Sequence, residues 1–341
     1  MDNRDYKVDN IRFLLIFFVV FGHLLELFSG QHTDILYRMI YTFHMPVFIF
    51  VTGYFARFNP KKILLSLIYP YFLFQTLYLL FQGYMIDGAH TVTPVYTTPY
   101  WLLWYLLATI FYYMLIPLIQ WESAGVKAVI LSASIVISLL AGQDNTMGYY
   151  MSLSRFFCFL PFFIAGFFSG HKPLILRESV PKKNKGLIFW FCLIFLIIAE
   201  CFILSDAETF SRKVLYGSYS YASAEYTWAQ RAVLHATAFA WIGVLFIGIP
   251  GRKLPIISTI GKNTLPVFLF HGFVIRFLRQ IPVFQYTQTG NLWLAAAIAL
   301  AILLLFGNPC CAWLCKWGFT GHWIDALVNL RKRRIVSKHQ N

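Results

Sequence analysis

Four ionisable residues follow one face of the first apolar segment of the chain. They are Asp9, Arg12, His23 and Glu26, set in a stretch that is otherwise mostly hydrophobic. On a helix turning 100° per residue, Arg12 and His23 differ by only about 20° in azimuth and by roughly 16 Å in height. Glu26 lies one turn beyond His23, within reach of its imidazole, and Asp9 lies one turn before Arg12. Because charged groups are costly to bury in apolar surroundings, this face is a candidate functional site.

Two further histidines reach a similar depth in other apolar segments. The hydrocarbon layer of a membrane is roughly 30 Å thick. If these segments cross such a layer as helices, His23 lies about 18 Å from its inner boundary, counted from Ile11. His44 then lies about 12 Å from its outer boundary, counted from Leu36. His271 also falls near the middle of its segment. The three histidines therefore predict one buried polar site. The alternative is that each histidine only supplies a helix–helix hydrogen bond, as polar residues in membranes commonly do.

A histidine beside a carboxylate is suited to general-base catalysis. An imidazole titrates near neutral pH, and a neighbouring carboxylate fixes its tautomer and stabilises the imidazolium. We therefore predict that His23, assisted by Glu26 and by His44, removes a proton from an acceptor hydroxyl.

Several charged residues near the inner ends of the first segments are candidates for binding a phosphorylated donor. They are Arg12, with Asp9 one turn before it, and the cations Arg57, Lys61 and Lys62 that follow the second segment. Guanidinium and ammonium groups are the usual partners of phosphate. For Arg57, Lys61 and Lys62 the competing interpretation is membrane topology alone. Arg12 differs because it enters the helix on the same face as the histidine.

The composition identifies the class of protein that must position these residues. Hydrophobic residues make up 59% of the chain and charged residues only 12%, whereas soluble domains carry about 25% charged residues. Aromatic residues reach 19%, which suits a lipid-facing surface with aromatic belts at its boundaries. The sequence therefore predicts an all-α integral membrane protein and excludes a soluble domain as its main body.

About ten apolar stretches are long enough to cross the hydrocarbon layer as helices. At 1.5 Å per residue, about twenty residues span roughly 30 Å, and only the fifth stretch is short. The predicted spans lie near Ile11–Gly30, Leu36–Ala56, Ile63–Ile86, Pro99–Gln120, Val126–Gly142, Met151–Gly170, Gly186–Ser205, Gln230–Ile249, Ile260–Gln280 and Asn291–Cys315.

The distribution of positive charge predicts how these helices are oriented. Of the 28 Lys and Arg residues, 20 fall in the terminal segments and in alternate loops, which indicates that these parts face the cytoplasm. Both termini are thus predicted to be cytoplasmic. The net charge of +14 then requires no nucleic acid partner, because a basic cytoplasmic face attracts anionic membrane lipids. Residues 1–316 form the predicted transmembrane domain and residues 317–341 a basic cytoplasmic tail.

The remaining features are interpreted as structural. Asp2, Asp5 and Asp9 interrupt the basic region that a cleavable signal peptide needs, so the first helix is predicted to be permanent. The six cysteines favour no metal site, and no metal is expected. The longest outer loop, near Asp206–Trp228, is rich in Ser and Tyr and is a candidate for covering or lining a site.

The order of several short motifs resembles the acyltransferase 3 family of integral membrane O-acyltransferases, and within it the fucose 4-O-acetylase-like branch. The resemblance extends over nearly the whole chain. It depends on Asp9-Asn10-Ile11-Arg12, Gly22-His23-Leu24-Leu25-Glu26, Phe43-His44-Met45-Pro46-Val47-Phe48, Thr52-Gly53-Tyr54, Leu103-Trp104-Tyr105-Leu106-Leu107-Ala108, Ser154-Arg155-Phe156, Leu160-Pro161-Phe162-Phe163 before Gly166, and Gly261-Lys262-Asn263-Thr264-Leu265 leading to His271.

This resemblance implies an acyl-CoA donor on the cytoplasmic side, acetyl-CoA in the simplest case, and an acceptor hydroxyl on a cell-envelope or exported glycan. It also implies that His23 is catalytic, that Arg12 serves the donor, and that residues 1–316 form the acyltransferase domain. The expected location is the cytoplasmic membrane of a bacterium, as a multi-pass protein. The chain departs from the family pattern at Tyr112 and Tyr113, where a Trp-Arg pair is common.

Four residues are candidates for contacting the acceptor. Arg155 begins the sixth span at the outer side, Trp104 and Tyr105 have rings on which a sugar could stack, and His271 belongs to the histidine set. The competing interpretation of Arg155 is an interfacial cation with its head in water. For Trp104 and Tyr105 it is packing alone.

Two other functions compete with acyl transfer. One is a secondary transporter or flippase of a sugar or lipid-linked intermediate, which ten helices, midplane histidines and inner cations would serve equally well, although we find no internal repeat to support it. A non-catalytic membrane partner that docks through the basic tail is the weaker rival. Within acyl transfer, direct attack of the acceptor and a covalent acetyl-histidine relay both remain open.

Overall fold

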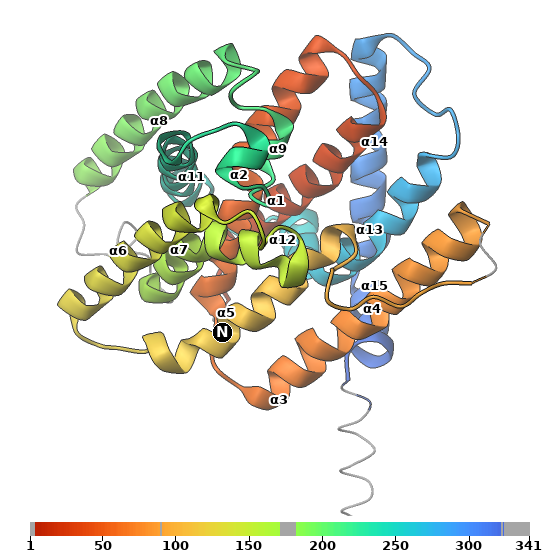
Figure 1. The fold of residues 1–341 in the computed structure, drawn as a ribbon, viewed down its shortest axis with the longest axis horizontal. Helices are drawn as coiled ribbons and strands as arrows, with labels where there is room; N and C mark the ends of the chain where they lie inside the picture. Colours follow the sequence, from red (N-terminus) through yellow and green to blue (C-terminus); the bar gives the residue numbers. More distant parts are fainter. Residues whose placement is uncertain (1–3, 89–90, 171–181, 322, 324–341) are drawn as a thin grey trace, which may run out of the picture.

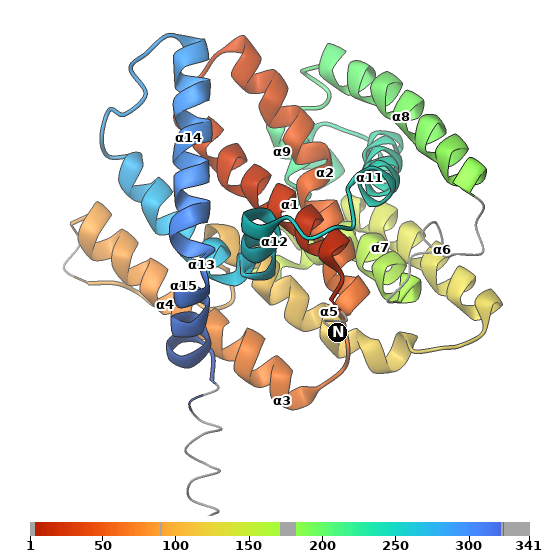
Figure 2. The same ribbon diagram turned by 180° about the vertical axis from the view of Figure 1, so that it is seen from behind.

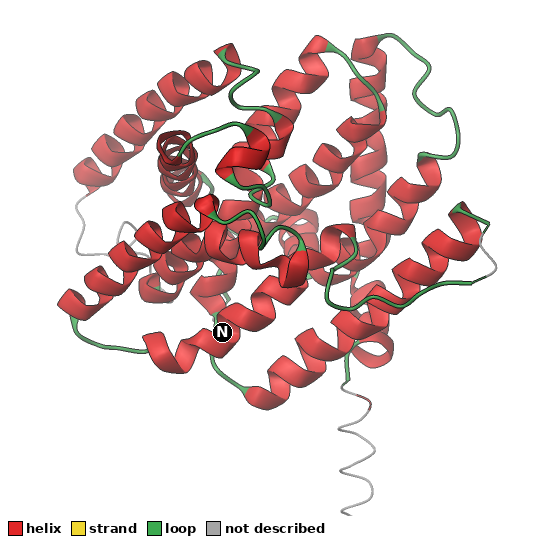
Figure 3. Cartoon of the chain, in the orientation of Figure 1, coloured by secondary structure: helices red, strands yellow, loops and turns green. Residues whose placement is uncertain are grey.

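The chain folds as a bundle of helices joined by short loops. The computed structural model describes residues 4–88, 91–170, 182–321 and 323, and those residues form helices and loops without a strand (Figure 3). This confirms the predicted all-α class. Of the predicted tail, 317–341, the structure describes only 317–321 and 323, and residues 171–181 of one predicted cytoplasmic loop also lie outside the described residues.

Fifteen α-helices are defined in the described part of the chain. They are α1 (Tyr6–Leu24), α2 (Gln31–Phe55), α3 (Pro60–Ile63), α4 (Tyr69–Leu80), α5 (Trp104–Ile119), α6 (Ala124–Leu140), α7 (Leu153–Ser169), α8 (Lys182–Ser205), α9 (Arg212–Leu215), α10 (Tyr221–Ala224), α11 (Trp228–Gly248), α12 (Pro255–Lys262), α13 (Thr264–Leu278), α14 (Gln288–Phe306) and α15 (Pro309–Leu314). Wider π-helical turns join α3 to α4 and extend α4, so that 60–86 form one continuous span.

Nine helical segments of the described chain are long and apolar enough to cross a membrane. They match nine of the ten predicted spans. The prediction of one continuous ninth span, Ile260–Gln280, is wrong. Asn263 leaves the helical conformation, with φ −107° and ψ 40°, and separates the 8-residue α12 from the 15-residue apolar helix α13.

Helix α1 lies at the centre of the bundle. It contacts α2, α12, α13 and α14, while α6 and α8 lie at one edge and α4 and α14 at the other (Figures 1 and 2). The edge helix α8 exposes large apolar side chains such as Ile194, Ile197 and Phe202, as a lipid-facing helix must. We call the end of the bundle where α1 begins the inner end, and the end where α1 finishes the outer end.

Helices α2 and α7 cross at two glycines. A Cβ atom on Gly53 would overlap the carbonyl oxygen of Phe163, and one on Gly166 would overlap that of Phe50. Small residues of this kind allow helix backbones to approach closely in membranes. The crossing holds α2, which carries His44, against α7, which carries Arg155.

The outer segment between α8 and α11 is fastened to the bundle by buried polar contacts. The guanidinium of Arg231 donates hydrogen bonds to the carbonyl oxygens of Ser138 (2.9 Å) and Tyr219 (3.2 Å) and to the hydroxyl of Tyr226. The Tyr37 hydroxyl donates to that of Tyr216 at 2.9 Å. This segment therefore packs over the outer end of α2, as expected of a loop that covers a site.

Candidate active site

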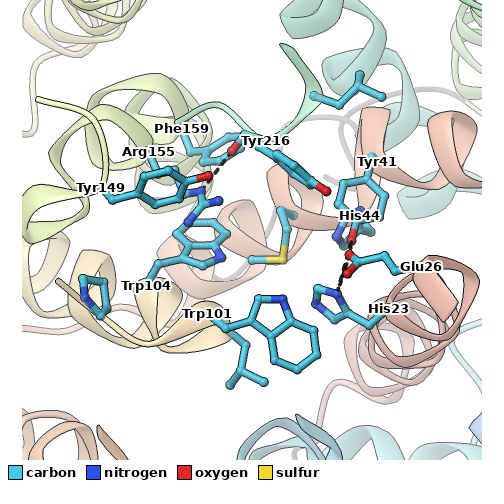
Figure 4. Close-up of a pocket in the computed structure, with 14 residues that line it drawn as sticks. His23, Glu26, Tyr41, His44, Trp101, Trp104, Tyr149, Arg155, Phe159 and Tyr216 are labelled. Carbon is cyan, nitrogen blue, oxygen red and sulfur yellow. Dashed lines mark hydrogen bonds and ion pairs between the residues drawn. The ribbon is translucent and has the colours of Figure 1, made fainter. Parts of the chain in front are cut away.

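His23 lies at the outer end of α1, where the helix tightens into a 3₁₀ turn that carries Glu26. The His23 Nδ1 atom lies 3.1 Å from Glu26 Oε1, and the Tyr41 hydroxyl donates to the same oxygen at 2.9 Å (Figure 4). Arg279 Nη2 lies 3.5 Å from Glu26 Oε2. Because a carboxylate only accepts, Nδ1 of His23 carries the proton and Nε2 is left with its basic lone pair.

The other two predicted histidines lie close to His23. The His271 ring stacks on that of His23 with 5.7 Å between centroids, and the His44 ring packs edge-on against Tyr41 at 4.6 Å. Nδ1 of His44 donates to the Ile40 carbonyl (2.7 Å), and Nδ1 of His271 to the Val267 carbonyl (2.9 Å). Among the described residues, neither of these rings is hydrogen-bonded or ion-paired to a carboxylate, so it is the imidazole of His23 that Glu26 contacts directly.

An outer cavity of about 270 Å³ opens beside these groups. His23, Glu26, Tyr41 and His44 line one side of it, and Trp101, Trp104, Tyr149 and Arg155 line the other (Figure 4). His271 is buried outside the lining. A volume near the lower end of ligand pockets, which begin at roughly 300 Å³, is suited to a small group such as one sugar ring.

The outer loop closes one wall of this cavity. Tyr216 lines it. Burial raises the pKa of the Tyr216 hydroxyl, and the negative charge of Glu26 raises it further. The phenol therefore stays protonated over the physiological range. The backbone carbonyl of Tyr216 accepts a hydrogen bond from Arg155 Nε at 3.0 Å.

Trp101 is a site residue that the sequence reasoning missed. Its ring lies 4.7 Å from that of His23, and its backbone is left-handed, with φ +35°. The neighbouring turn contains two more left-handed residues, Met151 (φ +49°) and Ser152 (φ +55°), and the Met151 amide donates to the Thr97 carbonyl at 2.7 Å. Strained non-glycine backbone of this kind gathers at functional sites. Nothing in the local sequence announces it, since these residues are neither Gly nor Asn.

An inner cavity of about 260 Å³ lies on the opposite side of His23. Arg12 lines it, and its Nη2 atom donates to Thr264 Oγ1 at 2.7 Å. Tyr105 lines it as well, with its hydroxyl 2.5 Å from Thr52 Oγ1. Most other lining residues are apolar, so the cavity offers one guanidinium within hydrophobic walls.

A third, smaller space lies between the two cavities. A space of about 20 Å³ shares Phe48, Tyr105 and Phe268 with the inner cavity, and His23 and Trp104 with the outer one. This is about enough room for one water molecule. His23 therefore stands where the inner and outer spaces meet.

The remaining candidates lie outside these cavities. Asp9 pairs with Arg4, whose Nε lies 2.5 Å from its carboxylate. Arg57, Lys61 and Lys62 are exposed near the inner end and do not line the inner cavity. In the described residues, no three His, Cys, Asp or Glu side chains group as a metal site would require.

Residues 5–307 match the acyltransferase domain of the acyltransferase 3 family. Because this match covers most of the chain, the protein belongs to that family and is a multi-pass membrane acyltransferase.

Two curated relatives are similar to it. The chain is 26% identical to nodulation protein NolL of Sinorhizobium fredii in an alignment 337 residues long, gaps included, and the alignment covers 88% of this chain and 86% of NolL. A stretch of 58 residues, 16% of each chain, is 40% identical to nodulation protein NolL of Mesorhizobium japonicum. No solved structure matches.

Proposed function

We propose that the protein moves an acetyl group from cytoplasmic acetyl-CoA to a hydroxyl of a cell-envelope or exported glycan. The observation that supports this most directly is the position of His23. Its imidazole, paired with Glu26, stands at the junction of an inner and an outer cavity. A donor that enters from the inner end and an acceptor that enters from the outer end would meet at this group.

The transfer requires one proton to be taken up and returned. In the proposed step, His23 Nε2 removes the proton from the acceptor hydroxyl while the hydroxyl oxygen attacks the thioester carbonyl carbon. The carbon–sulfur bond of the tetrahedral intermediate then breaks, and the leaving thiolate takes the proton from the imidazolium. The products are the glycan ester and free CoA, so atoms and charge balance. Glu26 stabilises the imidazolium between the two events.

The inner cavity suits the donor arm. Its mostly apolar walls match the acyl group and the methylene parts of the pantetheine chain, and Arg12 supplies a cation on the lining. Arg12 is held in place by Thr264. Arg57, Lys61 and Lys62 stand outside the cavity, near enough to the inner end to contact phosphates in solution.

The nature of the acceptor is inferred from the outer cavity and from the relatives. A cavity lined by aromatic rings with a few polar groups is typical of small-molecule sites, and its size suits one sugar ring. The proposed membrane is the bacterial cytoplasmic membrane, since the relatives are bacterial proteins. A fucose-like deoxysugar is the acceptor that membership of the fucose 4-O-acetylase-like branch would imply.

Two alternatives make different predictions. In a covalent relay, His23 Nε2 itself attacks the thioester, and an acetyl-imidazole would accumulate when the acceptor is withheld. In a transporter, the break in the ninth span at Asn263 would be part of the transport path, as broken helices are in many carriers. A transporter would move its substrate without consuming acetyl-CoA.

The decisive experiment measures transfer of radiolabelled acetyl from acetyl-CoA to envelope glycan of the source cell. Membranes would carry the wild type, His23→Ala or His32→Ala at equal protein level. His32 is exposed at the start of α2, so His32→Ala is the matched control and should transfer normally. His23→Ala should lose activity by about 100-fold or more. Full activity in His23→Ala would remove His23 from the mechanism. Consistent failure of the wild type to label any glycan, together with uptake of the glycan, would favour the transporter.

A further inference from the structure

A guanidinium without a carboxylate partner lines the outer cavity. Arg155 donates from Nε to the Tyr216 carbonyl at 3.0 Å, and its two Nη atoms make no hydrogen bond to any described residue. Arg155 also forms no ion pair within the described part of the chain. Because a charge removed from bulk water is costly unless it is paired, this cation is incompletely satisfied by the described protein groups around it.

Two aromatic rings hold Arg155 without neutralising it. Its guanidinium carbon lies 4.9 Å from the centre of the Trp104 ring and 5.1 Å from that of Tyr149 (Figure 4). Rings on the guanidinium faces attract the cation but leave its edge available. With one face set on Arg155, Trp104 orients this cation instead of offering that face to a sugar.

The charge balance of the cavity leaves Arg155 in excess. Among the described residues that line the outer cavity, Glu26 is the one carboxylate. Glu26 already accepts from Tyr41, contacts His23 and faces Arg279 at 3.5 Å. The Glu26 carboxylate therefore already has partners, on the side of the cavity opposite Arg155.

We propose that Arg155 binds a negatively charged group of the acceptor, a carboxylate or a phosphate, so that the glycan is acidic at or beside the sugar that is acetylated. The free edge of a guanidinium matches two oxygens of either group in a bidentate pair. Arg155 lies across the cavity from His23 (Figure 4). An anion bound there would orient the sugar with a hydroxyl toward His23 Nε2. This inference rests on the proposed function.

The test compares acceptors that differ only in charge. Purified full-length protein in nanodiscs would receive acetyl-CoA with a methyl hexoside, the matching methyl hexuronoside or a hexose phosphate. The wild type should show a lower KM for one of the two acidic acceptors, and which one identifies the anion. Arg155→Gln should raise the KM for that acceptor roughly 10- to 100-fold and leave the KM for the neutral hexoside within about 3-fold.

Two further variants separate recognition from folding. Lys213→Gln removes an exposed cation from the same outer segment and should leave every KM unchanged. Arg155→Lys keeps the positive charge but loses the planar pair of N–H donors, so its KM for the acidic acceptor should fall between those of the wild type and Arg155→Gln. If Arg155 only supports the Tyr216 loop, Arg155→Gln will weaken all acceptors alike, and that result would overturn the proposal.

Failure of the proposed function gives a different result. A wild type that acetylates the neutral hexoside as well as the acidic ones contradicts the acidic acceptor while the acyl transfer stands. If no acceptor is acetylated, the acyl-transfer proposal fails, and tryptophan fluorescence during titration with the methyl hexuronoside and the hexose phosphate decides the anion site. Quenching in the wild type that is lost in Arg155→Gln supports that site. Equal quenching, or none with either compound, contradicts it.

Discussion

Arg12 of α1 is hydrogen-bonded to Thr264 at the break in the ninth span. Arg12 Nη2 lies 2.7 Å from Thr264 Oγ1, and Thr264 is the first residue of α13, directly after the non-helical Asn263. An unbroken helix would direct this side chain according to the helical repeat. The break instead places a hydroxyl beside the guanidinium at the inner cavity, which both residues line. The break in the span therefore positions the hydroxyl that orients Arg12.

Replacement of Thr264 by Val should weaken donor binding. Val keeps the shape of Thr but removes the acceptor of the Arg12 hydrogen bond. A hydrogen bond to a charged group contributes about 1.5–3 kcal/mol, so the KM for acetyl-CoA should rise by roughly 10-fold or more, with kcat much less affected. Thr264→Ser retains the hydroxyl and should stay close to wild type. Initial rates at varied acetyl-CoA would check this, and an unchanged KM in Thr264→Val would separate Arg12 from the donor.

Replacement of Glu26 by Gln should reduce kcat. An amide keeps a hydrogen bond to His23 but removes the charge that stabilises the imidazolium. The loss should be about 100-fold or more, within the range for impaired general-base catalysis. Glu208→Gln, at an exposed carboxylate of the outer loop, is the matched control. Steady-state rates at saturating donor would measure the effect. A Glu26→Gln enzyme with wild-type kcat would show that the charge is not needed.

The helical periodicity of the sequence was sufficient to predict that His23, Glu26 and the other two histidines lie near one another. The spacing of His23 and Glu26 fixes their proximity because both positions lie within one turn of the same element. The depths of His44 and His271 followed from counting residues inward from the span ends. Such reasoning works where one straight helix in a layer of known thickness determines the position.

The same reasoning could not reach residues positioned by loops. Trp101, whose own backbone is left-handed, packs against His23 from a loop. Arg155 lies between rings from two separate segments. The division at Asn263 was missed although the run Gly261-Lys262-Asn263-Thr264 interrupts the apolar pattern there. Asp9 lies near Arg12, as the spacing predicts, but its ion pair is with Arg4. The positions of Trp101 and Arg155 depend on tertiary contacts that the helical repeat does not encode.

The glycine crossing of α2 and α7 makes a prediction about stability. In Gly166→Ala the added methyl would meet the Phe50 carbonyl oxygen, which belongs to backbone and cannot rotate away. Overpacking of this kind costs typically 1–3 kcal/mol, so the midpoint of thermal unfolding in detergent should fall. Gly186→Ala is the control, because its added methyl meets no atom within 4 Å. Equal midpoints for the two variants would show that the helices separate readily at the crossing.

The strained turn before α7 should trade stability for activity. Ser152 holds φ at +55°, and its buried hydroxyl has no hydrogen-bond partner in the described structure. Glycine accepts this conformation without the steric cost of about 1–2 kcal/mol that other residues bear. It also removes the unpaired hydroxyl, although the greater freedom of unfolded glycine offsets up to about 1 kcal/mol. Ser152→Gly should therefore stabilise the protein by about 1 kcal/mol in unfolding measurements.

The consequence for activity follows from the position of this turn. It leads directly into the helix that carries Arg155 and is bonded to the loop that carries Trp101. A glycine there lets both walls of the outer cavity move, so the KM for the acceptor should rise several-fold while the KM for acetyl-CoA stays constant. Ser152→Ala isolates the hydroxyl, since it keeps the constrained backbone, and its acceptor KM should remain that of the wild type. A Ser152→Gly protein that is less stable than Ser152→Ala would contradict the strain argument, because only the glycine relieves the left-handed backbone.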